Sequence, residues 1–325
     1  MPLYKQLCHS VIHDIEKGKI GKDFQLPSIN EASRQYSISR DTIERCYKEL
    51  KRQEYIASVA GRGYFITGKK GARLKVLLVF NKLSPFKRII YDSFLTTLGK
   101  NVKVDLQIHH YNPTILKEII EDSLGKYHHY VIIPHFFHKT GEARVLKVLK
   151  KIPADQLLLL DKNLPKLGVR HASVFQDFKQ DIYDALVCAT DLLAKYHHIK
   201  IVCDRVRNRP VERIEGTTQF CVDNKKKFDV VLDVNREELQ PGTAYIVTDE
   251  GDLADLIKKI RRSEYELGKD IGIICFDDTP LKETLNITVA TTDFEAMGKT
   301  SASLLLSGEN NQVKNCFQLI RRGSL

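Results

Sequence analysis

Cysteine and histidine side chains are the groups in this chain that could bind a metal or form disulfides. The seven cysteines show no C-x-x-C spacing and no close pairing with histidine, so neither a zinc site nor the disulfide framework of a secreted protein is indicated. The histidines include three doublets, and none of these stands on a predicted helix with a carboxylate one turn away. We expect reduced, packed cysteines, histidines in loops or at strand ends, and no metal or other cofactor.

Charged residues that could bind a ligand occur on one face of a predicted amphipathic α-helix between residues 39 and 53. Apolar residues recur there at i, i+3, i+4 and i+7, namely Ile43, Cys46, Tyr47 and Leu50. The same spacing displaced by two residues, or ~200° of a helix, gives Asp41, Glu44, Arg45 and Lys48. A charged face opposite a core is usually only solvated, so its meaning depends on the elements around it.

An arginine flanked by glycines follows this helix. Gly61-Arg62-Gly63 lies between two runs with the composition of short strands, residues 55–59 and 64–67. The pattern predicts a β-hairpin with Arg62 at its tip, where the glycines let the backbone approach another surface.

Two further helices must position these groups. Leu3, Leu7, Val11 and Ile15 form one apolar stripe, which Gly18 ends. Ser28 and Glu31 have the spacing of a capping box for a short helix from Ile29 to Tyr36, and Ser39 is placed to cap the longer helix. The order is helix, helix-turn-helix and hairpin wing.

The charge is concentrated in the same segment. Residues 1–75 hold 15 Lys+Arg against 8 Asp+Glu, a net charge of +7, which leaves +3 of the total +10 for the other 250 residues. A basic segment of domain size indicates a polyanionic partner, and no amphipathic membrane anchor accompanies it. The apolar runs are also far shorter than the ~18 residues of a membrane span, so we expect a cytoplasmic protein without a membrane partner.

Residues 2–67 resemble the GntR family of transcription regulators. The resemblance rests on Pro2-Leu3-Tyr4, Leu26-Pro27-Ser28, residues 38–42 (ISRDT), Tyr47-x-x-Leu50 and residues 61–65 (GRGYF). It implies a winged helix-turn-helix whose DNA-binding residues are Ser28, Arg40, Asp41, Thr42, Arg45, Arg62 and Gly63.

Two positions depart from the family pattern. The family often has arginine where this chain has Asn30 and Glu44. Glu44 either accepts a hydrogen bond from a cytosine amino group or pairs with Lys48 at i+4, and the pairing is favoured. The operator sequence therefore cannot be transferred from relatives.

Beyond residue 73, strand and helix patterns alternate to about residue 276, which predicts parallel sheets covered by helices on both faces. The expected elements include a helix near 142–149, a strand at 157–161, a long helical stretch at 177–196 and a strand at 230–234. Because 250 residues are too many for one such sheet, we expect two lobes with a ligand cleft at the carboxyl ends of the strands. The fold class is α/β with three parts: a DNA-binding domain at 1–67, a linker at 68–73, and an effector-binding and dimerisation domain at 74–325. Six linker residues span at most ~20 Å.

The second part resembles the sugar-responsive domain of the LacI family, which is similar to periplasmic sugar-binding proteins. Residues 271–281 (IGIICFDDTPL), Thr291-Thr292, Met297-Gly298 and residues 319–324 (LIRRGS) carry the resemblance. The expected effector-binding residues are Phe136, Asp177, Arg213, Asp249 and Asp277. Asp249 and Asp277 could instead be helix caps after strands. The chain contains no tryptophan, so an aromatic side chain on which a sugar ring stacks must be phenylalanine or tyrosine.

These observations predict a homodimeric, cytoplasmic DNA-binding regulator, a repressor of a carbohydrate-use operon that binds double-stranded operator DNA and a monosaccharide or its phosphate. The alternatives are a carbohydrate-active enzyme and a plain sugar-binding protein with a basic accessory domain. No nucleophile elbow, P-loop, GxGxxG or metal motif supports an enzyme. A plain binding protein would not need the wing or the basic segment.

Overall fold

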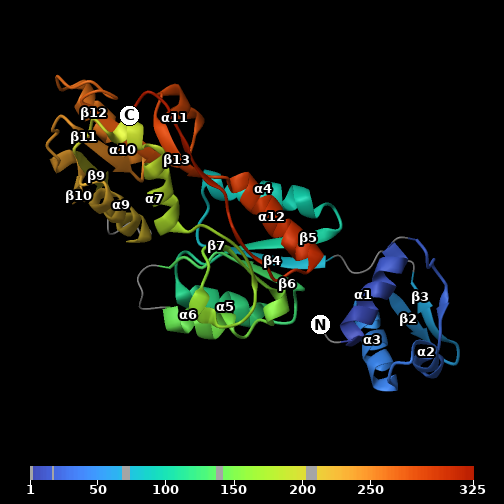
Figure 1. Cartoon of the computed structure of the whole chain (residues 1–325). Helices are drawn as coiled ribbons and strands as arrows, with labels where there is room; N and C mark the ends of the chain where they lie inside the picture. The colour runs from blue at the N-terminus through green and yellow to red at the C-terminus, as the bar shows by residue number, and fades with distance from the viewer. Residues whose placement is uncertain (1–2, 17, 68–73, 137–141, 203–210) are drawn as a thin grey trace. The chain divides into compact units, whose positions relative to one another are not determined.

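The computed structural model describes residues 3–16, 18–67, 74–136, 142–202 and 211–325 (Figure 1). It divides into two compact units, one of residues 1–74 with 101–103 and one of residues 75–100 with 104–325. The predicted linker, residues 68–73, lies outside the described residues. No helix among the described residues is long and apolar enough to cross a membrane.

The first unit has the predicted order of helices and hairpin. It contains α1 (Leu3–Glu16), α2 (Ile29–Tyr36), α3 (Arg40–Arg52), β2 (Ile56–Val59) and β3 (Gly63–Ile66). The predicted capping box is confirmed, because Glu31 donates its backbone N–H to the Ser28 hydroxyl (3.2 Å) and the Glu31 carboxylate accepts from the Ser28 N–H (2.8 Å). Ser39 caps α3, as predicted.

A third strand in this unit was not predicted. β1 (Gln25–Leu26) pairs antiparallel with β3 and completes a sheet of order β1-β3-β2. Two residues are too few to show a period-2 pattern, so this strand exists only through its pairing with Tyr64 and Phe65 of the hairpin.

The second unit contains two α/β lobes, confirming the predicted fold class. The sheet of lobe 1 has the order β14-β8-β7-β6-β4-β5, with every pairing among β4, β6, β7, β8 and β14 parallel. Its elements are β4 (Leu74–Phe80), α4 (Pro85–Leu98), β5 (Val102–Ile108), α5 (Pro113–Ser123), β6 (His129–Ile132), α6 (Glu142–Leu149), β7 (Leu157–Asp161), β8 (Ala172–Phe175), α12 (Phe294–Ser307) and β14 (Gln312–Lys314).

The sheet of lobe 2 has the order β10-β9-β11-β12-β13-β15, parallel except that β15 runs antiparallel to β13. Its elements are α7 (Phe178–Cys188), α8 (Thr190–Leu193), β9 (His198–Val202), α9 (Val211–Asp223), β10 (Lys227–Val231), β11 (Thr243–Val247), α10 (Glu250–Arg261), β12 (Ile271–Phe276), α11 (Pro280–Thr284), β13 (Thr288–Thr292) and β15 (Phe317–Ile320).

Two details of the predicted pattern were wrong. The helix expected from Asp177 to Tyr196 is two helices that meet at Ala189. The strand expected at 230–234 lies at Lys227–Val231, because Asp233 caps a 3₁₀ turn by accepting from the Asn235 N–H (2.9 Å) and so ends the extended backbone.

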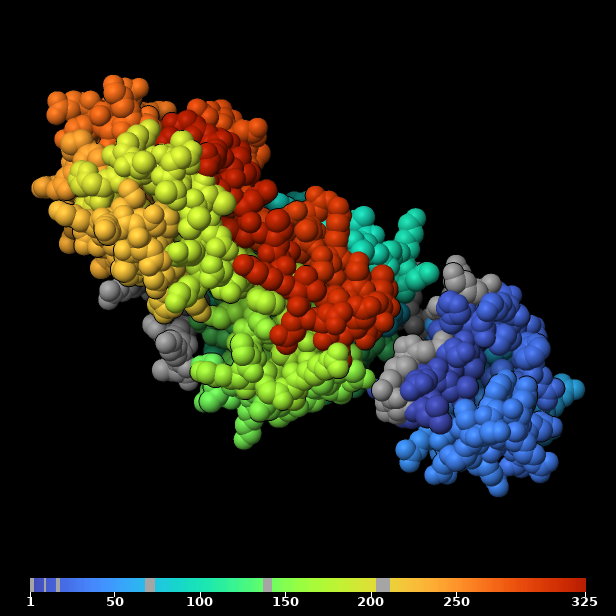
Figure 2. Space-filling model, viewed as in Figure 1, coloured from blue at the N-terminus to red at the C-terminus, as the bar shows by residue number. Residues whose placement is uncertain are grey.

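The chain crosses between the lobes three times, after β8, after β13 and after β14. The C-terminal helix α12 thereby returns to lobe 1 and packs beside α4, and its red surface lies against the teal part of lobe 1 in Figure 2. Asn315 (5% exposed) ties the three crossings together. Its backbone N–H donates to the Phe175 carbonyl (2.7 Å), and its amide donates to the Thr292 hydroxyl (3.0 Å) and the Asp293 carbonyl (2.9 Å).

Candidate DNA-binding surface and effector site

The recognition helix α3 presents its polar face to solvent. Asp41 and Arg45 are exposed and Thr42 is half-buried, whereas the predicted apolar stripe lies in the core. Arg40 is the first residue of α3 and is exposed, so its guanidinium belongs to the amino-terminal end of the helix. Ser28, in the turn before α2, is also exposed.

Of the two roles considered for Glu44, the structure contains the ion pair. Lys48 Nζ lies 2.7 Å from Glu44 Oε1, one helical turn away. The hydrogen bond and charge of Lys48 lower the pKa of the Glu44 carboxyl below its usual value, so Glu44 is ionised at neutral pH.

The wing holds Arg62 at its tip, as predicted. The Arg62 N–H donates to the Val59 carbonyl (3.0 Å), and its own carbonyl accepts from Gln25 Nε2 (2.6 Å). Gly61 and Gly63 have φ values of +72° and +100°, which side-chain-bearing residues rarely adopt. The two glycines and the anchor from β1 therefore fix the tip while the Arg62 side chain is exposed.

A buried charged cluster lies in lobe 1 where β7 and β8 end. Asp161 (5% exposed) forms an ion pair with Lys87 of α4 (7% exposed). Asp161 Oδ2 also lies 3.2 Å from His135 Nε2, and Oδ1 accepts from Gln176 Nε2 (2.5 Å). Burial alone would raise the pKa of Asp161, but Lys87 and His135 hold it well below its usual range.

The neighbouring strand ends carry acceptors without partners. Among the described residues, Asn81 Oδ1, His109 Nδ1 and Gln176 Oε1 are buried and have no hydrogen-bond partner. Burial lowers the pKa of His109 to about 4, so its ring is neutral. Because His109 Nε2 lies 2.9 Å from the Ile133 carbonyl and must donate to it, Nδ1 is an acceptor.

The predicted residue Phe136 lies beside this group. Its ring centroid is 4.7 Å from that of His109, and the side chain is half-buried after β6. This places an aromatic face next to unpaired acceptors, which is the combination that sugar hydroxyls and C–H groups require.

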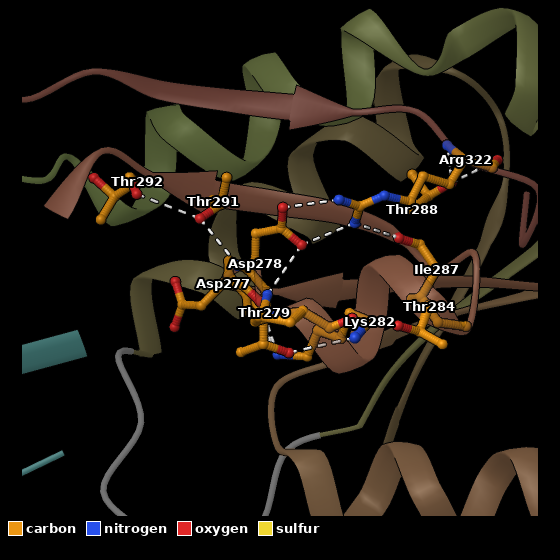
Figure 3. Close-up of polar contacts among 12 residues, drawn as sticks. Asp277, Asp278, Thr279, Lys282, Thr284, Ile287, Thr288, Thr291, Thr292 and Arg322 are labelled. Carbon is orange, nitrogen blue, oxygen red and sulfur yellow. Dashed lines mark hydrogen bonds and ion pairs between the residues drawn. The ribbon is translucent and has the colours of Figure 1, made fainter. Parts of the chain in front are cut away.

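In lobe 2 the two consecutive aspartates after β12 have different environments (Figure 3). Asp278 forms a bidentate ion pair with Arg322, with both N–O distances 2.8 Å. The Asp277 carboxylate points away from that pair and accepts no hydrogen bond from the described residues. Burial raises the pKa of Asp277, and the nearby charge of Arg213 opposes the rise.

The backbone around Asp277 is held in an uncommon conformation. Asp277 has a φ of +61°, and its carbonyl accepts from the buried Lys282 ammonium (2.7 Å), which also donates to the Phe276 carbonyl (3.0 Å). Such a backbone is found at functional sites where the surroundings over-determine it. Lys282 therefore fixes the direction of the Asp277 side chain.

Arg213, on the first turn of α9, stacks on two aromatic rings. Its guanidinium carbon lies 3.8 Å from the Phe276 centroid and 5.5 Å from the Phe178 centroid. The Phe178 ring also lies 5.7 Å from the His135 ring of lobe 1. Together with an ion pair between Lys162 and Glu212 (3.0 Å), these contacts join the lobes beside Asp277.

The other two predicted effector residues are helix caps. Asp177 accepts from the Gln180 N–H (3.2 Å) at the start of α7, and Asp249 accepts from the Gly251 N–H (2.9 Å) at the start of α10. The cap considered as an alternative is thus present at Asp249, whereas the side chain of Asp277 caps no helix among the described residues.

The prediction missed four members of the lobe 1 cluster, Lys87, His135, Asp161 and Gln176. Asp161 and Gln176 stand directly after apolar strands, so their position at carboxyl ends could have identified them. Lys87 is one of many lysines on helices, and nothing in the sequence distinguishes it.

Comparison with known families assigns both parts of the chain. Residues 3–66 match the bacterial regulatory proteins of the gntR family, and residues 201–325 match the periplasmic binding protein-like domain. The chain joins a GntR-type DNA-binding domain to a periplasmic-binding-protein-like domain.

Relatives of this chain include helix-turn-helix transcription regulators. The regulator YdeL of Bacillus subtilis is 38% identical over 65 residues, 20% of this chain and 14% of YdeL. YurK of the same organism is 29% identical over 37% of this chain and 52% of YurK, so the chain spans less than two thirds of either relative. The arabinose metabolism transcriptional repressor of Geobacillus stearothermophilus is 21% identical over 100% of this chain and 96% of its own length.

Solved structures share the fold of the second unit. The trehalose repressor of Escherichia coli superposes with a TM-score of 0.62 at 15% identity, covering 76% of this chain and all of that chain. A LacI family regulator from Lactobacillus casei with bound sucrose gives 0.61 at 13% identity, covering 77% and 99%. At this identity the likeness establishes the fold.

Proposed function

We propose that this chain is a sequence-specific transcription regulator that represses a carbohydrate-use operon under the control of a sugar or sugar-derived effector. The observation that carries the proposal is the presence in one chain of an exposed recognition helix with its wing and of a two-lobed domain in which no described residue donates a hydrogen bond to the Asp277 carboxylate at a strand end. The arabinose repressor, alignable along the whole chain, supports the same combination.

The proposed DNA contacts lie on α2, α3 and the wing. Arg40 and Arg45 reach base edges in the major groove from the first turns of α3, assisted by Asp41 and Thr42, while Ser28 contacts the backbone. Arg62 enters the minor groove or binds its phosphates, with Gly63 allowing the close approach. Two-fold operators require two such modules, so the active form we propose is a homodimer acting on DNA in the cytoplasm.

The proposed effector site lies between the two lobes, where their strands end. In lobe 2, Asp277 and Arg213 bind vicinal hydroxyls of the ligand. In lobe 1, Asn81, His109 and Gln176 accept hydrogen bonds from other ligand hydroxyls. Phe136 supplies the aromatic face. Asp177 and Asp249 keep their capping roles and are the remaining effector contacts that we propose. A monosaccharide or its phosphate has the size and donors for this site.

Two linked measurements test the proposal. A thermal-shift screen of the full chain against monosaccharides, disaccharides and their phosphates should yield a ligand that raises Tm. At a ligand concentration of 100 Kd, binding should stabilise the folded protein by about 2.7 kcal/mol. Selection of duplexes from a random library should yield a common operator. Recovery of no preferred sequence would contradict the proposed function.

A further inference from the structure

The core of the DNA-binding unit contains two cysteines in contact. Cys8 of α1 and Cys46 of α3 have sulfur atoms 3.1 Å apart, and α1 packs directly on α3. A disulfide has an S–S length of about 2.05 Å, so an approach of roughly 1 Å would allow a bond. Both thiols are free in this structure.

Packing alone does not explain the pairing, because many apolar side chains could fill these positions in the core formed with Ile43 and Leu50. The two thiols are chemically unequal. The contact between the two sulfur atoms lowers the pKa of the Cys8 thiol, and the same contact together with burial raises the pKa of Cys46. Cys8 also keeps 3% of its surface exposed and Cys46 none, so a small oxidant reaches Cys8 first.

We propose that Cys8 and Cys46 are an oxidation site at which a peroxide forms an intrachain disulfide that staples α1 to the recognition helix. The Cys8 thiolate attacks one peroxide oxygen, the O–O bond breaks, and the leaving hydroxide takes a proton to become water, giving a sulfenic acid. The Cys46 sulfur then attacks the Cys8 sulfur, the S–O bond breaks, and the hydroxide leaves as water with the Cys46 proton. Two thiols lose two electrons and two protons, and hydrogen peroxide becomes two waters.

The site is independent of the proposed function, since it depends only on contacts within one unit. Cys46 belongs to the buried stripe of α3, whereas Arg40 and Arg45 are exposed. The bond therefore forms on the core side of the helix and constrains the chain between residues 8 and 46.

Peptide mapping of the full chain tests the proposal. The protein is treated with hydrogen peroxide, denatured, alkylated and digested with trypsin, which releases Cys8 in residues 6–17 and Cys46 in residues 46–48. The expected product is these two peptides joined with the loss of two hydrogens, and dithiothreitol should separate them. In Cys46→Ala the sulfenic acid of Cys8 should persist and react with dimedone.

Cys221→Ala is the matched control, because Cys221 is equally buried but lies in the second unit, and the linked peptides should still form. Recovery of residues 6–17 and 46–48 as separate alkylated peptides, at a peroxide dose that already oxidises the exposed Cys188, would overturn the proposal. Linkage of Cys8 to any cysteine other than Cys46 would overturn it as well. The wild-type map decides even where a variant does not fold.

Discussion

Neighbouring residues of one type have separate roles in lobe 2. Asp278 is neutralised by two hydrogen bonds from Arg322 and stabilises the C-terminal segment against β13. The backbone carbonyl of Asp277, one residue earlier, accepts from Lys282, and its carboxylate accepts no hydrogen bond from the part of the chain that the structure describes. Asp277 is half-buried, and partial removal of a carboxylate from water without a compensating hydrogen bond is unfavourable. A ligand that donates hydrogen bonds to this carboxylate offsets that cost.

Replacing Asp277 by Asn should therefore weaken effector binding ten- to a hundredfold, about 1.5–3 kcal/mol, because a charge-assisted hydrogen bond is lost. The fold should persist, since the side chain caps no described helix. Calorimetry with the sugar from the screen measures the change, and Asp233→Asn, at an exposed turn cap, is the control. Wild-type affinity in Asp277→Asn would mean that the ligand lies elsewhere.

Arg40→Ala and Arg62→Ala should both weaken operator binding and leave effector affinity unchanged. Arg40→Ala should also relax base preference, by about 1–3 kcal/mol, because a bidentate base contact is removed. Gel-shift titration on the selected operator measures both effects. Arg52→Ala removes the same charge from the far end of α3, where Arg52 pairs with Glu49, and an equal loss in that control would contradict specific contact.

The buried pair in lobe 1 predicts a pH dependence of stability. The folded-state pKa of Asp161 lies below its unfolded value of about 3.9, so its contribution is fully present above that value and disappears as pH falls through the folded value. Asp161→Asn should lower the free energy of unfolding by about 3–5 kcal/mol at neutral pH, because Lys87 stays buried and unpaired.

Urea unfolding of wild type and Asp161→Asn from pH 7 down to pH 3 tests this. The difference between the two proteins should be constant near neutrality and shrink below about pH 4. The double variant Lys87→Met, Asp161→Asn should recover part of the loss at pH 7. A difference that does not change with pH would show that the ionised pair is not its source.

Among individual residues, the sequence predicted the positions of those that belong to short local motifs. Arg62 between two glycines and the capping pair Ser28 and Glu31 could be placed because the neighbouring residues determine their geometry. Lys87 and Asp161 could not be paired, because they are 74 residues apart and meet only when lobe 1 folds.

Among the elements, the three crossings between the lobes depend on one amide. Asn315 contacts all three segments, so one buried side chain links the connections between the lobes. Asn315→Ala removes the side-chain bonds to the Thr292 hydroxyl and to the Asp293 and Cys316 carbonyls, and it keeps the backbone bond to Phe175.

Asn315→Ala should destabilise the second unit by about 1–3 kcal/mol, because the Thr292 and Asp293 oxygens lose a buried donor. Thermal unfolding with and without ligand measures the effect. The control is Asn311→Ala, which removes an exposed amide that donates to Glu309. Equal stability of Asn315→Ala and wild type would show that the three crossings between the lobes do not depend on the Asn315 side chain.

Element type and order followed from periodicity wherever one face of the segment is buried. α6 was predicted at its observed bounds because its buried residues recur with the helical period. β7 was predicted at its observed bounds because a short continuous apolar run is typical of a strand buried on both faces. β14 was missed because Gln312 and Lys314 are exposed and its pairing with β8 is the cause of its extended form. The break at Ala189 has no glycine or proline to mark it.

For the whole molecule, sugar binding and operator binding must be linked by one coupling free energy. If a sugar weakens operator binding by some factor, the operator must weaken sugar binding by the same factor. We attribute the transmission to residues 68–73, so inserting ten Gly/Ser residues there should preserve both affinities and remove most of the coupling.

The most direct test is operator affinity measured by fluorescence anisotropy with and without saturating sugar, in wild type and in the insertion variant. Coupling of about 1–3 kcal/mol predicts a change of roughly 5- to 150-fold in wild type and little change in the variant. Full retention of the sugar effect in the variant would contradict transmission through the linker, residues 68–73. An operator affinity that saturating sugar leaves unchanged in wild type would contradict the claim that this chain is a sugar-controlled regulator.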